Sequence, residues 1–245
     1  MWPRAVVTVA LRGPGKALLL ASAAGWIATA WLLAGDRLPY SAEAMSHGEH
    51  VAASTATRLF HASGHFTAMW LAMILAMAPP LLLREIGRLW RTSLHRVRHV
   101  TLAWFVCGYV GLWLLVGVAL MVLAGWVTVS SERIAAAVAL VALWHCSPAR
   151  QRRLNACHRV PPLRVFGIAA PWDSLRYGIS TGCACAAACG PIMLIALLVT
   201  DHHLVAMAVA SVAITVERHA PARRPRWTLP LRLSRSPDWA PLDSR

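Results

Sequence analysis

The sequence predicts an all-α membrane protein, a polytopic bundle of about six transmembrane helices with both termini in the cytoplasm. Hydrophobic residues make up 58% of the 245 positions and charged residues only 14%, whereas a soluble domain carries about a quarter charged residues. Lys and Arg are confined to short segments between long apolar runs, as in a multi-pass membrane protein. No stretch has a strand pattern that competes with these helices.

The same composition excludes other classes of protein. Most of the chain is too apolar to be disordered. The net charge of +14 would suit nucleic acid, but the basic residues are segregated between apolar runs, so we expect a lipid bilayer and no nucleic acid as partner. The six cysteines lie in or next to apolar stretches, which is not the pattern of a secreted disulfide framework.

Six apolar segments are expected to cross the bilayer. In chain order they are residues 17–35, 66–83, 101–125, 134–146, 179–199 and 204–216. The first and third are clearly long enough for a hydrocarbon core of about 30 Å, and the second and fifth are close to that length. The fourth and sixth offer only about 20 Å of apolar helix, so they need flanking residues or a locally thinned bilayer.

The distribution of charge supports six spans. If all six segments cross, 21 of the 24 Lys and Arg residues fall on one side, which the positive-inside rule identifies as cytoplasmic. Without the fourth crossing, the loop containing six arginines would lie outside. We therefore expect a cytoplasmic N-terminus over residues 1–16, a membrane domain over 17–219 and a disordered basic tail over 220–245.

A row of soft metal ligands runs along the second predicted span. His65, Met69, Met73 and Met77 repeat every four residues, a spacing that keeps side chains on one helix face. Thioethers are soft ligands for Cu(I), and imidazole suits copper in either oxidation state. The alternative is ordinary packing, because methionine fills irregular gaps between helices well.

A second row lies in the fifth predicted span. Cys185, Cys189 and Met193 have the same spacing of four, with Cys183 nearby, and three thiols within seven residues favour metal binding. The alternative is that cysteine acts as a small hydrophobe at a tight helix crossing, since Gly and Ala surround these positions. Pro191 removes a backbone hydrogen bond and is expected to kink the helix near Cys189.

The two rows are expected to face each other. The second span runs inward and the fifth outward, so their ligands would form successive sites of two or three ligands across a shared seam. Such a series allows a metal ion to be exchanged stepwise between neighbouring sites.

Several motifs in order resemble a family of bacterial integral membrane proteins predicted to bind metal. The first is Trp70-x-x-Met73-x-x-Ala76-Met77-Ala78-Pro79. The others are Ser147-Pro148-Ala149-Arg150, Cys157, the run containing Gly178, Gly182, Cys185, Cys189 and Met193, and finally Glu217-Arg218. The family is the one of unknown function numbered 2182, sometimes labelled copper chaperone, and the resemblance covers about residues 60–220. It implies a location in the bacterial inner membrane.

At several positions where the family pattern has a residue that can bind metal, this chain has a different residue. Ala78 stands where a second Met is expected, Thr181 replaces a His, Ala188 replaces one of two adjacent Cys, and Arg153 replaces the first Cys of a loop pair. Cys183 is offset by two residues from the family position. Five soft residues of the pattern remain, namely Met73, Met77, Cys185, Cys189 and Met193.

The leading interpretation is a membrane protein that binds a soft metal, Cu(I), and transports it or delivers it to a copper-protein client. The alternative is a non-catalytic scaffold or assembly partner whose small-residue face in the fifth span packs against another membrane protein. We do not expect an enzyme, because no Asp or Glu lies in the core of a predicted span and no phosphate loop or nucleophile elbow occurs. The sequence does not indicate an oligomeric state.

Overall fold

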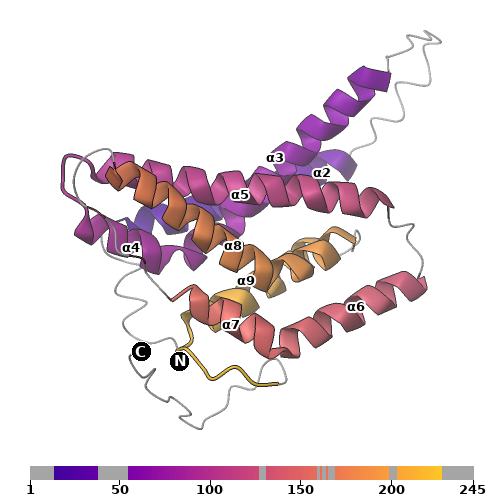
Figure 1. Cartoon of the computed structure of the whole chain (residues 1–245). Helices are drawn as coiled ribbons and strands as arrows, with labels where there is room; N and C mark the ends of the chain where they lie inside the picture. The colour runs from indigo at the N-terminus through magenta and orange to yellow at the C-terminus, as the bar shows by residue number, and fades with distance from the viewer. Residues whose placement is uncertain are drawn as a thin grey trace. The chain divides into compact units, whose positions relative to one another are not determined.

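The computed structural model describes residues 14–37, 55–126, 131–158, 161, 164, 169–198 and 203–227 (Figure 1). This part of the chain is all-helical, with eight α-helices and no strand, as the sequence predicts. The helices are α2 (Gly15–Arg37), α3 (Thr55–Leu81), α4 (Leu83–Thr92), α5 (Arg98–Trp126), α6 (Ser131–Cys146), α7 (Pro148–Ala156), α8 (Ala169–Leu198) and α9 (His203–His219).

The chain divides into two compact units, residues 1–87 and 88–245, and each is described by itself. In the first unit α2 packs against α3. In the second unit α8 is the central helix, because α5, α7, α9 and α6 all pack against it. The predicted N-terminal segment up to residue 13 and the tail beyond residue 227 lie outside the described residues.

Each of the six predicted spans falls on a helix. Within the described residues, three helices are long and apolar enough to cross a membrane, over Gly15–Ala34, Gly64–Leu81 and Arg98–Leu120. Helix α6 contributes a shorter apolar stretch, Ala135–Cys146. The other two predicted spans lie on α8 and α9, and their crossing of the membrane stays a prediction.

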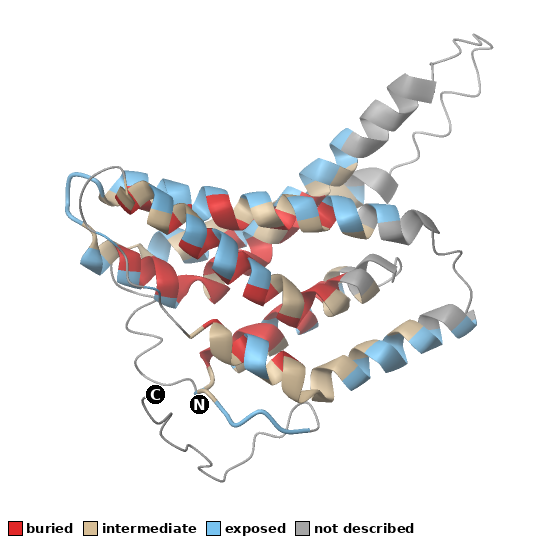
Figure 2. Cartoon of the chain, in the orientation of Figure 1, coloured by how far each residue is buried: buried red, intermediate tan, exposed pale blue. Residues whose placement is uncertain are grey.

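Large apolar side chains on the outside of these helices fit a lipid environment. Leu20, Ile27 and Trp31 of α2 are each more than 70% exposed, and Leu115 of α5 is 69% exposed. Figure 2 shows exposed and buried residues alternating along the helices. Water would disfavour so much exposed apolar surface, whereas lipid tails would cover it.

In the first unit, α2 and α3 touch backbone to backbone. A Cβ atom on Gly25 would lie 2.3 Å from the backbone nitrogen of Ala76, so only glycine permits this crossing. The hydroxyl of Ser22 donates a hydrogen bond of 2.5 Å to the Ala76 carbonyl. In a regular helix the N–H of residue 80 would serve that carbonyl, but residue 80 is proline and has no N–H.

In the second unit, α5 and α8 cross just as closely. A Cβ atom on Gly178 would lie 2.1 Å from the Phe105 carbonyl oxygen, and one on Gly108 would lie 2.5 Å from the Leu175 carbonyl oxygen. Small residues of this kind let membrane helices approach until their backbones are in contact. The glycines predicted to serve a tight helix crossing therefore do so at Gly178 and Gly182, both against α5.

The contacts also show that α5 and α8 run in the same direction. Gly178 of α8 faces Phe105, and Gly182, one turn later, faces Leu112, further along α5. Two parallel helices need a connection that returns the chain to its starting side. Helix α6 lies between them in the sequence.

The start of α8 is held by a surface ion pair. Arg164 donates from Nε and Nη2 to the two carboxylate oxygens of Asp173, at 2.8 and 2.9 Å, and from its backbone N–H at 3.2 Å. This hydrogen bonding and the positive charge of Arg164 lower the pKa of Asp173 to about 2. Asp173 therefore stays ionised near neutral pH and continues to bind Arg164.

Replacing Gly178 with alanine should separate α5 from α8. Alanine normally stabilises a helix by about 1 kcal/mol relative to glycine, but here the added Cβ would collide with the Phe105 carbonyl. We expect Gly178→Ala to lower the free energy of unfolding in detergent by about 1–3 kcal/mol. The control is Gly111→Ala on α5, where no atom lies within 4 Å of the new Cβ. Equal stability of the two variants would contradict the close crossing.

Candidate metal centre

Three sulfur-bearing side chains line one buried face of α8. Cys185, Cys189 and Met193 are 1%, 3% and 8% exposed, respectively, and the spacing of four residues places them one turn apart. The thiols of Cys185 and Cys189 lie within interaction range of each other. Thr181, one turn before Cys185, is also buried on this face.

The third thiol of the segment points elsewhere. Cys183 is exposed, because two residues correspond to about 200° around the helix axis, which is nearly the opposite face from Cys185. Within the described ranges, no three His, Cys, Asp or Glu residues are grouped so as to hold a metal ion. A soft-metal site on α8 would therefore consist of two thiols and a thioether.

Helix α5 supplies a polar contact to the first thiol. The hydroxyl of Tyr109, which is 1% exposed, donates a hydrogen bond of 3.4 Å to the sulfur of Cys185. The Tyr109 ring packs beside Trp113, with ring centroids 6.5 Å apart. The sequence analysis missed Tyr109, although a tyrosine hydroxyl within an apolar span requires a partner and is a recognisable signal.

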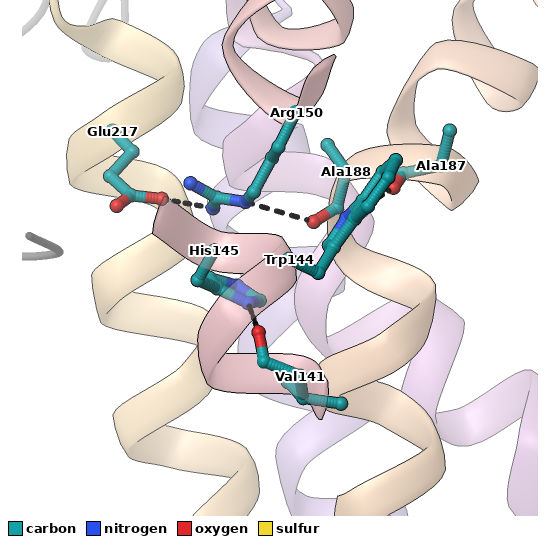
Figure 3. Close-up of polar contacts among 7 residues, drawn as sticks. All are labelled: Val141, Trp144, His145, Arg150, Ala187, Ala188 and Glu217. Carbon is teal, nitrogen blue, oxygen red and sulfur yellow. Dashed lines mark hydrogen bonds and ion pairs between the residues drawn. The ribbon is translucent and has the colours of Figure 1, made fainter. Parts of the chain in front are cut away.

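A proline in α8 leaves a carbonyl that another helix satisfies. Pro191 has no N–H to donate to the carbonyl of Ala187, four residues earlier. The indole Nε1–H of Trp144, near the end of α6, donates to that carbonyl instead, at 3.1 Å (Figure 3). Pro191 thus leaves an open acceptor on α8, and α6 is held to α8 through it. The predicted kink near Cys189 stays a prediction.

A buried arginine links three helices beside the sulfur row. Arg150 of α7 is 4% exposed; its Nε donates to the Ala188 carbonyl at 3.2 Å, and its Nη2 forms an ion pair with Glu217 of α9 (Figure 3). Ser147 caps α7 by accepting from the Arg150 N–H at 3.2 Å. Two motifs of the sequence, Ser147–Arg150 and Glu217-Arg218, therefore meet in space.

The electrostatic environment of Cys189 includes two positive charges. Arg218 and Arg150 both act on this thiol, and both are 4% exposed. Buried guanidinium groups attract negative charge strongly, because little water screens them. Arg150 is already paired with Glu217, so Arg218 is the second positive charge that acts on the Cys189 thiol.

The methionine row belongs to the first unit. Met73 and Met77 of α3 are each 2% exposed, Met69 is half-buried and His65 is exposed. The row thus becomes more buried along α3. The predicted pairing of this row with the α8 thiols concerns the relation between the two units and stays a prediction.

Comparison with known proteins identifies one family. A family model described as PpoB2, copper chaperone, matches residues 67–231, which is well over half of the chain. The match begins in α3, includes Met69, Met73 and Met77, and continues through α8 and α9. No curated protein and no solved structure matches the chain.

Removing the indole N–H of Trp144 should show whether it satisfies the carbonyl that Pro191 leaves open. We expect Trp144→Phe to lower the free energy of unfolding by about 1–2 kcal/mol, because the half-buried Ala187 carbonyl loses its donor. In the Pro191→Ala background residue 191 regains an N–H that can serve the Ala187 carbonyl. Trp144→Phe should therefore lower the free energy of unfolding only slightly in that background. A double-mutant cycle in detergent measures this coupling. A cost that is the same in both backgrounds would rule out the compensation.

Proposed function

The chain belongs to the copper chaperone family PpoB2, the family of unknown function numbered 2182, and on this premise we propose that it binds Cu(I) within the membrane and passes it on. Its role would be to handle copper as cargo, by delivery to a copper-protein client or by transport. We propose binding and transfer, without catalysis, as its activity.

The observation that carries this proposal is the buried sulfur row of α8. Cys185 and Cys189 are one turn apart and shielded from solvent, with Met193 one turn further on. Thiolates and thioethers prefer Cu(I) to harder metal ions. A cuprous ion between two thiolates carries a net charge of −1, and the positive charges of Arg150 and Arg218 would offset it at this buried position.

We assign the remaining soft residues to metal exchange. His65, Met69, Met73 and Met77 would form a series of weak sites along α3, in which each thioether shares the ion with the next. The burial of Met73 and Met77 supports this assignment, since a buried row keeps a weakly held ion away from water. Cys183, on the exposed face of α8, would serve capture or release and not the buried site.

We further propose that the chain crosses the bacterial inner membrane six times with both termini in the cytoplasm. Helices α5 and α8 run in the same direction. The chain would therefore cross the membrane an even number of times between the start of α5 and the start of α8, which supports crossings by both α5 and α6. The concentration of 21 of the 24 basic residues on one side supports the orientation.

The alternative, a scaffold that binds another membrane protein through the small-residue face of α8, has less support. Gly178 and Gly182 already pack against α5 of the same chain. A partner helix would have to displace α5 in order to use them. The scaffold hypothesis accounts for the two buried thiols as small apolar residues, but it assigns no role to the arginines beside Cys189.

Copper content tests the proposal directly. The full-length protein, loaded with Cu(I) and purified under reducing conditions, should retain about one copper per chain when both thiols are present. Cys185→Ser/Cys189→Ser should bring the metal content to background, because serine oxygen is a hard and weak ligand for Cu(I). Cys183→Ser, a matched change on the exposed face, should retain the metal. The same copper content in all three proteins would end the proposal and favour the scaffold.

Tyr109 should strengthen metal binding through its hydrogen bond to Cys185. Donation to a metal-bound thiolate stabilises its negative charge, so Tyr109→Phe should weaken Cu(I) binding by about tenfold. Competition with a chromogenic Cu(I) chelator at constant pH gives the affinity. Tyr177→Phe removes a hydroxyl that is equally buried in the same unit and should leave the affinity unchanged. Unchanged affinity in Tyr109→Phe would show that the hydroxyl has no part in binding.

A further inference from the structure

The chain segment that follows α9 is held against α7 by a defined set of hydrogen bonds. The side-chain amide of Asn155 donates to the Arg223 carbonyl at 2.7 Å, and its oxygen accepts from the Arg223 N–H at 3.3 Å. The Gln151 amide donates to the same Asn155 oxygen at 2.9 Å, which supports this orientation of Asn155. Residues 221–227 are not helical, and this clasp holds the backbone of Arg223 beside α7.

The clasp places exposed basic residues of α7 and of this segment close together. Arg152 and Arg153 of α7 are exposed, and so are Arg223 and Arg224. No Asp or Glu occurs in residues 147–158 or 220–227. Trp227 follows at the end of the described segment with 63% of its surface exposed. We define Arg152, Arg153, Arg223, Arg224 and Trp227 as the basic surface.

The arginines of this region form two groups, one buried and one exposed. Arg150 of α7 and Arg218 of α9 are buried, with Arg150 paired to Glu217. Their neighbours in the basic surface are exposed instead. The buried arginines therefore serve the interior of the second unit, and the exposed ones are available to a partner outside it.

We propose that the basic surface binds the phosphate headgroups of anionic phospholipids in the leaflet next to the end of α9. The segment begins directly after a helix expected to cross the membrane, so its arginines would lie at the level of the headgroups. Clustered arginines at this position attract anionic lipids, and tryptophan is enriched at the same interface. The Asn155 clasp holds the segment in place, which reduces the ordering cost of binding.

This inference does not depend on copper binding, and it applies to the chain as an integral membrane protein. It assigns a role to Asn155 and Gln151, which take no part in the candidate metal centre. In this proposal the arginines of α7 and those of the segment after α9 bind the same lipid headgroups, although 68 residues separate Asn155 from Arg223.

The test is amide hydrogen exchange of the full-length protein in lipid nanodiscs. In discs containing about 30 mol% phosphatidylglycerol, residues 222–227 should exchange about fivefold more slowly than in pure phosphatidylcholine discs. Arg223→Gln/Arg224→Gln should abolish this difference. Arg88→Gln/Arg91→Gln, which removes the same charge from the exposed side of α4, should preserve it. Asn155→Ala should speed exchange of the segment in both lipids and reduce the effect of phosphatidylglycerol.

Equal exchange of residues 222–227 in the two lipids would overturn the proposal. Slower exchange on addition of soluble polyglutamate, without an effect of phosphatidylglycerol, would also overturn it and would identify an acidic protein as the partner. Exchange of the α5 and α8 peptides reports whether each variant is folded. A lipid effect that persists in Arg223→Gln/Arg224→Gln would exclude these arginines as its cause.

Discussion

A backbone carbonyl shielded from water and without a hydrogen-bond donor is costly, and this constraint shapes both units. Pro80 in α3 and Pro191 in α8 each withhold the N–H that the carbonyl four residues earlier requires. A side chain of a neighbouring helix serves each carbonyl, the Ser22 hydroxyl in the first unit and the Trp144 indole in the second. The prolines thereby determine where the neighbouring helices attach, and each attachment lies within a turn of the sulfur ligands.

The buried Arg150 extends this arrangement to α7 and α9. Its guanidinium group would be unstable in an apolar interior without partners, and the Ala188 carbonyl and Glu217 provide them. Ala188 directly precedes Cys189, so the turn of α8 that carries the thiols is bonded to two other helices. A thiol held in this way would keep its position during the metal exchange that we propose.

Two of the departures from the family pattern, Thr181 and Ala188, fall on the same buried face of α8 as the retained sulfur atoms. Thr181 and Ala188, which stand where the pattern has His and Cys, are 4% and 1% exposed. Their positions explain how this chain has fewer metal-ligand residues than the family pattern without a disturbed fold, since small uncharged side chains are easily buried. This chain is left with Cys185, Cys189 and Met193 on that face, a set suited to a metal ion of low coordination number such as Cu(I).

The sequence by itself determined the all-helical architecture and the places of six of the eight described helices, although α3 and α8 begin well before the predicted spans and α4 and α7 were not predicted. It also showed the two rows of sulfur-bearing residues. These features are local: apolar runs, arginine segregation and a spacing of four are all read along one segment. Only the tertiary structure decided that Tyr109 bonds to Cys185, that Trp144 serves Ala187 and that Arg150 meets Glu217 across 67 residues. Hydropathy shows that a side chain avoids water, and periodicity shows which face carries it. Neither specifies the neighbouring helix, because that choice depends on backbone contacts such as the one at Gly178.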